Sequence, residues 1–443
     1  MAKRKKPKLP KVRSPVPPPS FPMGKSGYDR KGEKERLKKE VEEYEQTKKE
    51  EASDIVAMAR EIEEEVIKRR RDFHAHPEPC FQEVRTSSII AQELKSLGIE
   101  VKKGLARTGV IGYLKVSQAQ GTIALRADMD ALKMDEESDL PFRSRTPGVA
   151  HTCGHDAHMA MLLGAAKILS RLKADLPYNV KFVFQPCEEC PPGGAETLIE
   201  AGVLKEVDEI YGLHVFSALE SGIFGIKEGP AMAAVDKFEI EIKGKGGHGA
   251  MPHLSIDPVP LAAEAVLALQ TIPGRRRDPT DAVVLSVCQI QGGTAFNVIP
   301  ETVSLSGTVR TLSEKTRGQM PGMMEEILRG IAEPRGATYK LDYQPGYSAL
   351  HNDPECVEKV RRSVKVLFGK EALREMPVIM VSEDFAYYLK HTKGAFIFLG
   401  VGNEKIGANA PHHSPHFVID EGALYRGIAL LAHLAYAQSK VIS

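Results

Sequence analysis

The chain has 443 residues, with 60 Lys and Arg against 59 Asp and Glu, so its formal net charge is only +1. Apolar residues make up 42% and charged residues 27%, as in an ordinary soluble globular protein. No run approaches the roughly 18 consecutive apolar residues of a membrane-spanning helix, and the length allows two or three domains with sizeable cores.

The small net charge hides an asymmetry at the N-terminus. Residues 1–50 carry 16 basic and 8 acidic residues, so the rest of the chain is mildly acidic. Residues 1–22 contain seven prolines, and residues 29–52 are almost all Lys, Glu and Arg. Neither composition can build a core, and no apolar signal-peptide region is present. We therefore predict a basic extension over residues 1–52, largely disordered or an exposed helix, and favour a solvated tail over a nucleic-acid-binding arm.

From residue 53 onward, predicted helices and strands alternate, which favours an α/β layer with a mostly parallel sheet. In chain order we expect helices at Ile55–Arg71 and Thr86–Leu97, strands at Val110–Val116 and Thr122–Ala127, a helix at Met159–Leu172, a strand at Val180–Gln185, a helix at Ala195–Ala201 and a strand at Glu209–His214.

The pattern changes near residue 232. There the expected elements are strands at Lys237–Lys243, Ala282–Gln289, Thr302–Thr311 and Thr338–Tyr343, with helices at Pro258–Thr271 and Glu314–Glu333. This βαββαβ order is the ferredoxin-like arrangement. The α/β pattern then returns and ends in a helix at Leu424–Gln438. We predict one α/β domain formed by residues 53–231 and 347–443, interrupted by an inserted α+β domain at 232–346.

Metal-binding residue types crowd into the octet His151-Thr-Cys-Gly-His-Asp-Ala-His158. Cys153 and His155 are two positions apart, so in an extended or turn segment both side chains project to one side. Asp156 can cap the helix that follows. Thiolate and imidazole are good zinc ligands. The alternative is a buried free cysteine beside capping histidines.

Six cysteines are scattered through the chain, at positions 80, 153, 187, 190, 288 and 356. That distribution argues against a disulfide scaffold, and a reducing cytoplasm is the simplest expected location. Cys187 and Cys190 form a Cys-x-x-Cys motif, formally a redox or zinc motif. We do not favour that interpretation, because the sequence has no second such pair and no thioredoxin pattern.

Further polar clusters follow predicted strands, where the carboxyl ends of parallel strands open onto one crevice. They are Asp128 with Asp130, Glu188 with Glu189, His214, and His412 with His413. On extended backbone the side chains of Glu188 and Glu189 point apart, so one can bind a metal while the other accepts a proton from the reacting water. Four clusters at the edge that also carries Cys-x-His predict a metal-dependent catalytic site.

Together these motifs resemble the M20 family of metallopeptidases and amidohydrolases, in particular the aminoacylase/carboxypeptidase branch with hippurate hydrolases and auxin–amino-acid conjugate hydrolases. The matching segments are Arg70-Arg-Asp-Phe-His-Ala-His-Pro-Glu78, Leu125-Arg-Ala-Asp-Met-Asp-Ala-Leu132, His151–His158, Gln185-Pro-Cys-Glu-Glu189, Gly246-Gly-His-Gly-Ala-Met-Pro-His253, Phe296-Asn-Val-Ile-Pro300, Gly307-Thr-Val-Arg-Thr311, Ser382-Glu-Asp-Phe385 and His413-Ser-Pro-His-Phe417. They run from about residue 55 to the C-terminus.

The resemblance implies two divalent metal ions per subunit, zinc or manganese, with cobalt and nickel as alternatives. The implied ligands are Cys153, His155, Glu189, His214 and His413. His413 is preferred to its neighbour because the family pattern reads His-Ser-Pro. The resemblance also implies that the inserted domain forms a homodimer.

The remaining implied roles concern catalysis and substrate. Glu188 would be the general base, and Asp130 would orient a ligand imidazole. From the inserted domain, His248 would serve the partner's active site, Asn297 would reach the substrate, and Arg310 could anchor a carboxylate.

Two departures from the family pattern put substrate preference in doubt. The loop Cys190-Pro-Pro-Gly-Gly-Ala195 is one residue longer than usual, and Lys133 replaces a common proline. The expected function is metal-dependent hydrolysis of an N-acyl amino acid or short peptide. A carboxypeptidase or dipeptidase of the same family is the alternative, and a non-catalytic metal-binding protein is a more distant one.

Overall fold

The computed structural model describes residue 34, residue 38 and residues 49–437. Most of the expected extension over residues 1–52 lies outside this part, as does the last residue of the helix expected at Leu424–Gln438. By its internal contacts, the chain from Lys49 onward forms one unit. Within the described part, no helix is long and apolar enough to cross a membrane.

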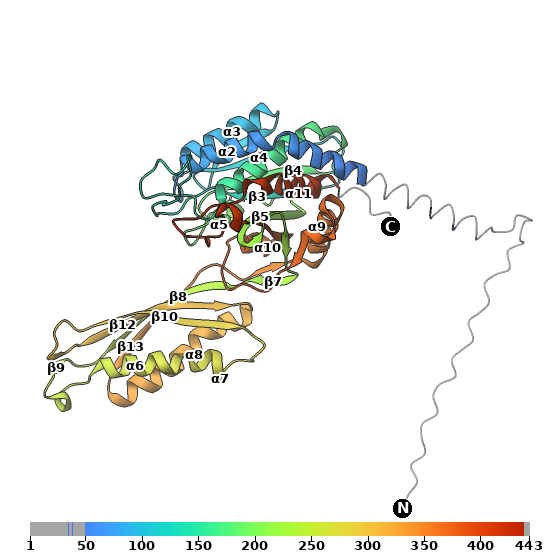
Figure 1. The fold of residues 1–443 in the computed structure, drawn as a ribbon. Coiled ribbons are helices and arrows are strands. Elements are labelled where there is room, and N and C mark those ends of the chain that lie inside the picture. Colours follow the sequence, from blue (N-terminus) through green and yellow to red (C-terminus); the bar gives the residue numbers. More distant parts are fainter. Residues whose placement is uncertain (1–33, 35–37, 39–48, 438–443) are drawn as a thin grey trace, which may run out of the picture. The chain divides into compact units, whose positions relative to one another are not determined.

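The larger sheet has the strand order β1-β2-β4-β3-β5-β16-β6-β15. Figure 1 labels its strands β3, β4 and β5. Its strands are β1 (Glu100–Leu105), β2 (Gly109–Leu114), β3 (Thr122–Asp128), β4 (Asn179–Gln185), β5 (Glu209–Glu220), β6 (Phe224–Ile226), β15 (Leu373–Glu375) and β16 (Lys393–Gly402). The central strands β4, β3, β5 and β16 pair in parallel. The predicted mostly parallel sheet is therefore confirmed. Antiparallel pairs, which the sequence analysis did not anticipate, join β1 to β2, β2 to β4 and β6 to β16.

Helices cover both faces of this sheet. One layer contains α2 (Glu63–Ala75), α3 (Val84–Ser96), α4 (His155–Arg171), α9 (Pro354–Phe368) and α11 (Leu424–Tyr436), and the other contains α5 (Ala195–Glu200) and α10 (Ala386–Leu389). All seven residues of β3 are buried, as expected for a parallel strand covered on both faces. Ile123 and Leu125 pack into the first core, while Ala124 between them packs into the second.

A smaller antiparallel sheet has the order β10-β12-β8-β13. Its strands are β8 (Ala234–Lys243), β10 (Val283–Gly292), β12 (Thr302–Thr311) and β13 (Thr338–Pro345). Helices α6 (Pro258–Leu269) and α8 (Glu314–Ala332) lie along one face and share a separate core with it (Figure 1). This is the expected βαββαβ order. The domain boundaries and the dimerisation role stay predictions.

Short elements complete the chain. They are β7 (Gly229–Met232) paired with β14 (Leu350–Asn352), β9 (Gly247–His248) paired with β11 (Val298–Ile299), and α7 (Thr271–Arg275). The first expected helix is observed as helical residues 49–61, a turn at Ile62, and α2.

Two local expectations near the site need correction. Strand β5 continues to Glu220, so His214 lies within the strand and not at its end. Its partner β16 also extends beyond the residue paired with His214, which keeps the ladder intact there. Helix α4 begins at His155, with Gly154 as its N-cap residue, and Asp156 makes no capping hydrogen bond. Asp156 instead has buried ionic partners, described below.

Candidate metal centre

Gly154 makes the sharp turn between Cys153 and His155. Its φ of +93° lies in the left-handed region that favours glycine. A Cβ atom at this position would lie 2.3 Å from Cγ2 of Val215, so a larger residue would collide with β5. The close approach of this turn to β5 brings Cys153 and His155 towards His214.

The start of α4 is tied to α2 by a buried ion-pair network. The Asp156 carboxylate accepts a hydrogen bond from Nε of Arg70 at 2.7 Å, and Nδ1 of His74 lies 2.8 Å from the same oxygen. Asp156 therefore serves as the partner of Arg70 and His74 and does not cap the helix. They fix the helix turn that carries His155.

All five expected ligands converge, in two overlapping sets. Cys153, His155 and His214 form one set, and Cys153, Glu189 and His413 form the other, with the ligand atoms of each set within 4.8 Å of one another. Sγ of Cys153 lies 3.5 Å from Nε2 of His214, and Oε1 of Glu189 lies 3.2 Å from Nε2 of His413. Two donor sets that share one thiol are suited to two neighbouring ions.

Backbone carbonyls orient two of these imidazoles. Nδ1 of His155 donates to the carbonyl oxygen of Asp130 at 2.9 Å, and Nδ1 of His214 donates to that of Val215 at 2.6 Å. The Nε2 atoms are therefore left for a metal. His158 is different, because Nδ1 contacts Asp128 at 2.6 Å and Nε2 accepts the N–H of Val215 at 2.9 Å. With both ring nitrogens engaged, His158 is a structural neighbour of the site.

The adjacent histidines His412 and His413 have different surroundings. Nε2 of His412 accepts the backbone N–H of Ser217 at 3.2 Å, and its ring stacks on Phe216. His413 adopts a left-handed φ of +62°, and its backbone N–H donates to the carbonyl oxygen of Thr152 at 2.9 Å. This conformation turns its imidazole towards Glu189, which makes it the better placed ligand.

The carboxylate of Asp130 supports the backbone that carries the two glutamates. Its oxygens accept the N–H groups of Glu188 at 2.8 Å and Glu189 at 3.0 Å. We expected Asp130 to orient a ligand imidazole through its carboxylate. In the structure its carbonyl oxygen is the nearer partner of His155, whose Nδ1 lies 3.5 Å from the carboxylate. The hydroxyl of Tyr347 donates to the carbonyl oxygen of Glu188 at 2.6 Å.

Negative charge dominates this centre. Burial, followed by the charges of Glu383 and Glu189, raises the pKa of Glu188 well above its ordinary value. Burial also raises the pKa of the Cys153 thiol, and Glu189 adds to this shift. For His155, burial acts to lower the pKa, but nearby carboxylates led by Asp128 outweigh it and raise the pKa to about 10. The centre therefore favours a positive charge beside Nε2 of His155.

The donor atoms fit divalent metal ions. Nε2 of His155 is buried and makes no hydrogen bond within the described part of the chain. Oε1 of Glu189 faces ring nitrogens, with Nε2 of His413 at 3.2 Å and Nε2 of His155 at 3.8 Å. Buried polar atoms seldom stay unpaired unless an ion or water completes them. A mixture of thiolate, imidazole and carboxylate is suited to zinc and admits manganese, cobalt or nickel.

A buried guanidinium that was not expected from the sequence joins the ends of β3 and β4 to the segment before α10. Arg126 donates to Gln185 at 2.9 Å, to Asp128 at 2.6 Å, to Glu383 at 3.1 Å and to Asp384 at 2.9 Å. A signal was available, because an arginine inside the apolar run Thr122–Ala127 can be buried only with charged partners. Its partners could not be read from the sequence.

The three substrate residues expected from the inserted domain are not in this cluster. His248 and Asn297 are exposed on the β9/β11 ribbon. Nδ1 of His248 accepts the N–H of Ala250 at 3.1 Å. Arg310 is half-buried and donates to the hydroxyl of Ser382 at 3.2 Å, beside the segment that reaches Arg126. Within the described residues, no contact joins His248 or Asn297 to the donor cluster.

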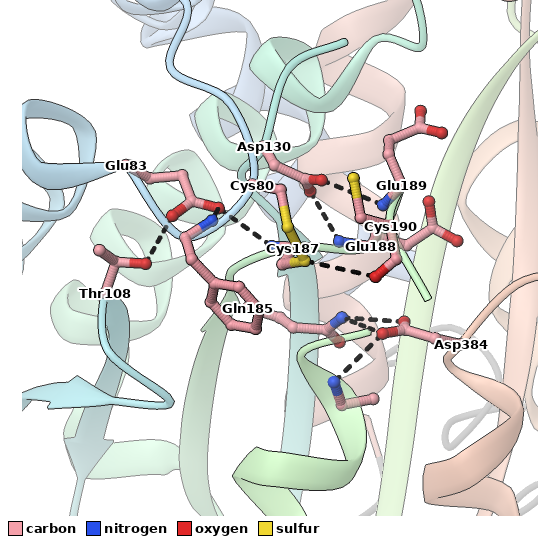
Figure 2. Close-up of a disulfide and its surroundings, with 12 residues drawn as sticks. Cys80, Glu83, Thr108, Asp130, Gln185, Cys187, Glu188, Glu189, Cys190 and Asp384 are labelled. Carbon is pink, nitrogen blue, oxygen red and sulfur yellow. Dashed lines mark hydrogen bonds between the residues drawn. A yellow bond between two sulfur atoms is a disulfide. The ribbon is translucent and has the colours of Figure 1, made fainter. Parts of the chain in front are cut away.

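A disulfide joins Cys80 to Cys187 across 107 positions of sequence, directly before the glutamate pair (Figure 2). It was not predicted, because only the folded chain brings these two cysteines together. The Cys187-x-x-Cys190 motif is therefore not a bonded pair here. Cys153, Cys190, Cys288 and Cys356 have free thiols.

The chain is similar along most of its length to proteins named as hydrolases. The model of Peptidase family M20/M25/M40 matches residues 124–437. Thermostable carboxypeptidase 1 of Saccharolobus solfataricus is 39% identical over 381 residues, which cover 85% of this chain and 96% of that protein. The N-acyl-L-amino acid amidohydrolase of Geobacillus stearothermophilus is 46% identical over 302 residues, covering 68% and 82% respectively.

A solved structure with a similar fold is that of the YXEP protein of Bacillus subtilis, described as a dinuclear metal-binding peptidase of the M20 family. It is 35% identical and superimposes with a TM-score of 0.75, over 85% of this chain and 98% of that one.

Proposed function

Because the chain belongs to peptidase family M20/M25/M40, it is a metal-dependent amidohydrolase, and we propose that it releases a free amino acid from an N-acyl amino acid. The observation that carries this proposal is the pair of donor sets sharing Cys153, with Glu188 beside them. A site that only stabilises the fold would be closed by four ligands and would not need an adjacent free carboxylate.

When bound, two divalent ions supply a polarised scissile carbonyl and a water molecule of lowered pKa. Glu188 then accepts a proton from the attacking water and passes it to the leaving nitrogen. Asp130 and Tyr347 hold the backbone of Glu188, so its carboxylate stays aimed at the reacting atoms.

The five ligands assigned by resemblance would hold the ions, and the geometry supports each of them. His155, His214, Glu189 and His413 lie around the thiol of Cys153, and together these five side chains would hold the two ions. The ions are zinc or manganese in our proposal, since thiolate and imidazole favour zinc while carboxylate admits manganese.

Substitution of the adjacent glutamates separates base from ligand. Glu188→Gln keeps size and hydrogen bonding but cannot accept the proton, so turnover should fall by roughly 10² or more while metal content stays near wild type. Glu189→Gln, the matched control one residue away, should lose metal as well. The reverse pattern, measured by metal analysis and turnover, would exchange the two roles.

The substrate class stays open between two activities found among similar proteins, amidohydrolase and carboxypeptidase. Both would need an anchor for the substrate carboxylate, and Arg310 is our candidate. We propose N-acyl amino acids as the preferred class. A panel of N-acyl amino acids and dipeptides, assayed for amino-acid release with and without chelator, tests this directly. Higher kcat/KM for dipeptides throughout the panel would favour the carboxypeptidase.

We also propose that the inserted domain pairs two subunits and that each site is built from both. His248 would stabilise the oxyanion in the partner's site, where an aimed donor contributes several kcal/mol. Its exposure on the β9/β11 ribbon is compatible with a contact outside its own chain.

Subunit exchange tests the composite site. His248→Ala and Glu188→Gln should each be poorly active, yet a mixed dimer combines an intact Glu188 with an intact His248 in one of its two sites. Activity should therefore reappear after exchange. A verified mixed dimer without activity would place His248 in its own chain's site or outside catalysis.

A further inference from the structure

The turn that presents the two glutamates is held from two sides. We call residues 186–190 the Glu-pair turn. On one side, Asp130 binds the N–H groups of Glu188 and Glu189. On the other, the backbone N–H of Cys187 donates to Oε1 of Glu83 at 3.0 Å, and Cys80 is bonded to the sulfur of Cys187 (Figure 2).

The contacts of Cys187 with Cys80 and Glu83 stabilise an unfavourable backbone conformation. Cys187 has a φ of +54°, in the left-handed region that a residue with a side chain seldom adopts. Its two partners, Cys80 and Glu83, come from the segment directly before α3. The carboxylate of Glu83 is itself fixed, because it accepts the hydroxyl of Thr108 at 2.5 Å. The disulfide and this carboxylate therefore set the position of the residue directly before Glu188.

A third sulfur lies beside the bond. The sulfur atoms of Cys80, Cys187 and Cys190 are all within 4.8 Å of one another. Cys187 is fully buried and Cys80 is half-buried, whereas Cys190 is exposed. The exposed free thiol of Cys190 therefore lies next to the disulfide. The buried sulfur of Cys187 is not accessible to a large reagent.

We propose that Cys80, Cys187 and Cys190 form a thiol–disulfide site that controls the hydrolase. The Cys80–Cys187 bond holds Glu188 in its working position, and Cys190 gives a dithiol reductant access to that bond. In a reducing compartment such as the one proposed from the cysteine distribution, disulfides are usually transient or redox-sensing. The expected change in kcat rests on the proposed role of Glu188 as general base.

Reduction proceeds by an internal thiol–disulfide exchange followed by attack of the dithiol. The Cys190 thiolate attacks Sγ of Cys187, the old S–S bond breaks with its electron pair on Sγ of Cys80, and that sulfur takes a proton. This step is redox-neutral and leaves a Cys187–Cys190 disulfide. A dithiol then attacks Sγ of Cys190, Cys187 leaves as a thiol, and the second sulfur of the reductant closes its own disulfide. The dithiol supplies both electrons and releases Cys190.

The effect on turnover should be partial and reversible. A well-placed general base contributes about 10²–10⁴ in rate, and small displacements forfeit part of this. After reduction, Asp130, Tyr347 and Glu83 still hold the turn. We therefore expect kcat to fall by about tenfold on reduction and to return on reoxidation, because most of the anchors remain.

The test uses the metal-loaded full chain isolated without reductant. Alkylation and peptide mass spectrometry should find Cys80 and Cys187 joined and Cys190 free. Timed treatment with dithiothreitol should reduce the bond and lower kcat at constant metal content. Cys190→Ser should be reduced at least tenfold more slowly, whereas Cys288→Ser, which removes another exposed free thiol, should follow wild type.

Two further variants keep the readouts distinct. Cys80→Ser with Cys187→Ser should have the low kcat of the reduced enzyme and no further response to the dithiol, which controls for chelation. Glu188→Gln should show wild-type reduction kinetics whatever its activity, so the thiol readout stands even if the base is misassigned. The inference is overturned by free Cys80 and Cys187 in the untreated protein, by unchanged kcat after full reduction, or by wild-type reduction of Cys190→Ser.

Discussion

Replacing Arg70 by methionine should destabilise the protein far more than the same change at Arg71. The two residues are neighbours on α2 and share Glu421 as a partner. They differ in burial, since the Arg70 side chain is 1% exposed and that of Arg71 is 46% exposed. Arg70 also pairs with Asp156, whose side chain is fully buried. This pair of substitutions therefore compares the loss of a buried ion-pair network with the loss of an exposed ion pair.

The expected loss in free energy of unfolding depends on the carboxylate that each substitution leaves without its arginine partner. Removing one partner of a buried ion pair typically costs about 3–5 kcal/mol, because the other charge stays buried without compensation. Asp156 would retain His74 at 2.8 Å, so we expect about 3 kcal/mol for Arg70→Met. Loss of the exposed Arg71 pair should cost less than about 1 kcal/mol.

Urea unfolding of the metal-loaded variants measures both costs through the shift in midpoint at unchanged slope. The double variant Arg70→Met with Asp156→Asn should recover much of the loss, since neither charge then remains. Arg70 and His74 outweigh burial and hold the pKa of Asp156 well below its usual range. In the wild type, the contribution of Asp156 to the free energy of unfolding is fully present at pH values above the pKa that Asp156 has in the unfolded chain. That contribution is lost as the pH falls through the lower pKa that Asp156 has in the folded protein. Equal midpoint shifts for Arg70→Met and Arg71→Met would refute the reasoning.

Three further outcomes are expected. Dialysis against a chelator should abolish activity and added metal should restore it, while Cys153→Ala should bind less metal; a fully active metal-free protein would contradict the mechanism. Deletion of residues 1–50 should leave turnover and thermal midpoint almost unchanged, and precipitation of the shortened chain would show that the segment is structural. Arg310→Met should raise KM for substrates with a free carboxylate but not for their amides, and equal effects on both would remove Arg310 from recognition.

Local patterns predicted strands β2, β3, β4 and β5 of the large sheet, whereas the short strands β6 and β15 and the edge strand β1 were not expected. Apolar runs such as Thr122–Ala127 and Val180–Gln185 identify strands because both faces of a parallel sheet are buried. Residues at the ends of such strands could then be grouped, since parallel strands present their carboxyl ends at one edge. The cluster of Cys153, His155 and Glu189 follows from this rule together with the family resemblance.

Long-range partners could not be predicted in the same way. Asp156 looked like a helix cap because its nearest neighbours in sequence are the start of a helix, yet its partner Arg70 is 86 positions away. Cys187 looked like half of a Cys-x-x-Cys motif, yet its bonded partner is 107 positions away. In both cases the neighbouring residues in the sequence suggested a local role, whereas the observed partner is brought close only when the chain folds.

The distribution of charge links the metal ions to the stability of the fold. The single guanidinium of Arg126 pairs with Asp128, Glu383 and Asp384, so the chain itself compensates part of the negative charge at this edge. In the described residues no Lys or Arg forms an ion pair with Glu188 or Glu189, and the only cationic partners of Glu189 there are the imidazoles of His413 at 3.2 Å and His155 at 3.8 Å. Buried carboxylates without a cation either take up protons or destabilise the fold. Because divalent ions would supply the missing charge, their binding energy should contribute to folding as well as to catalysis.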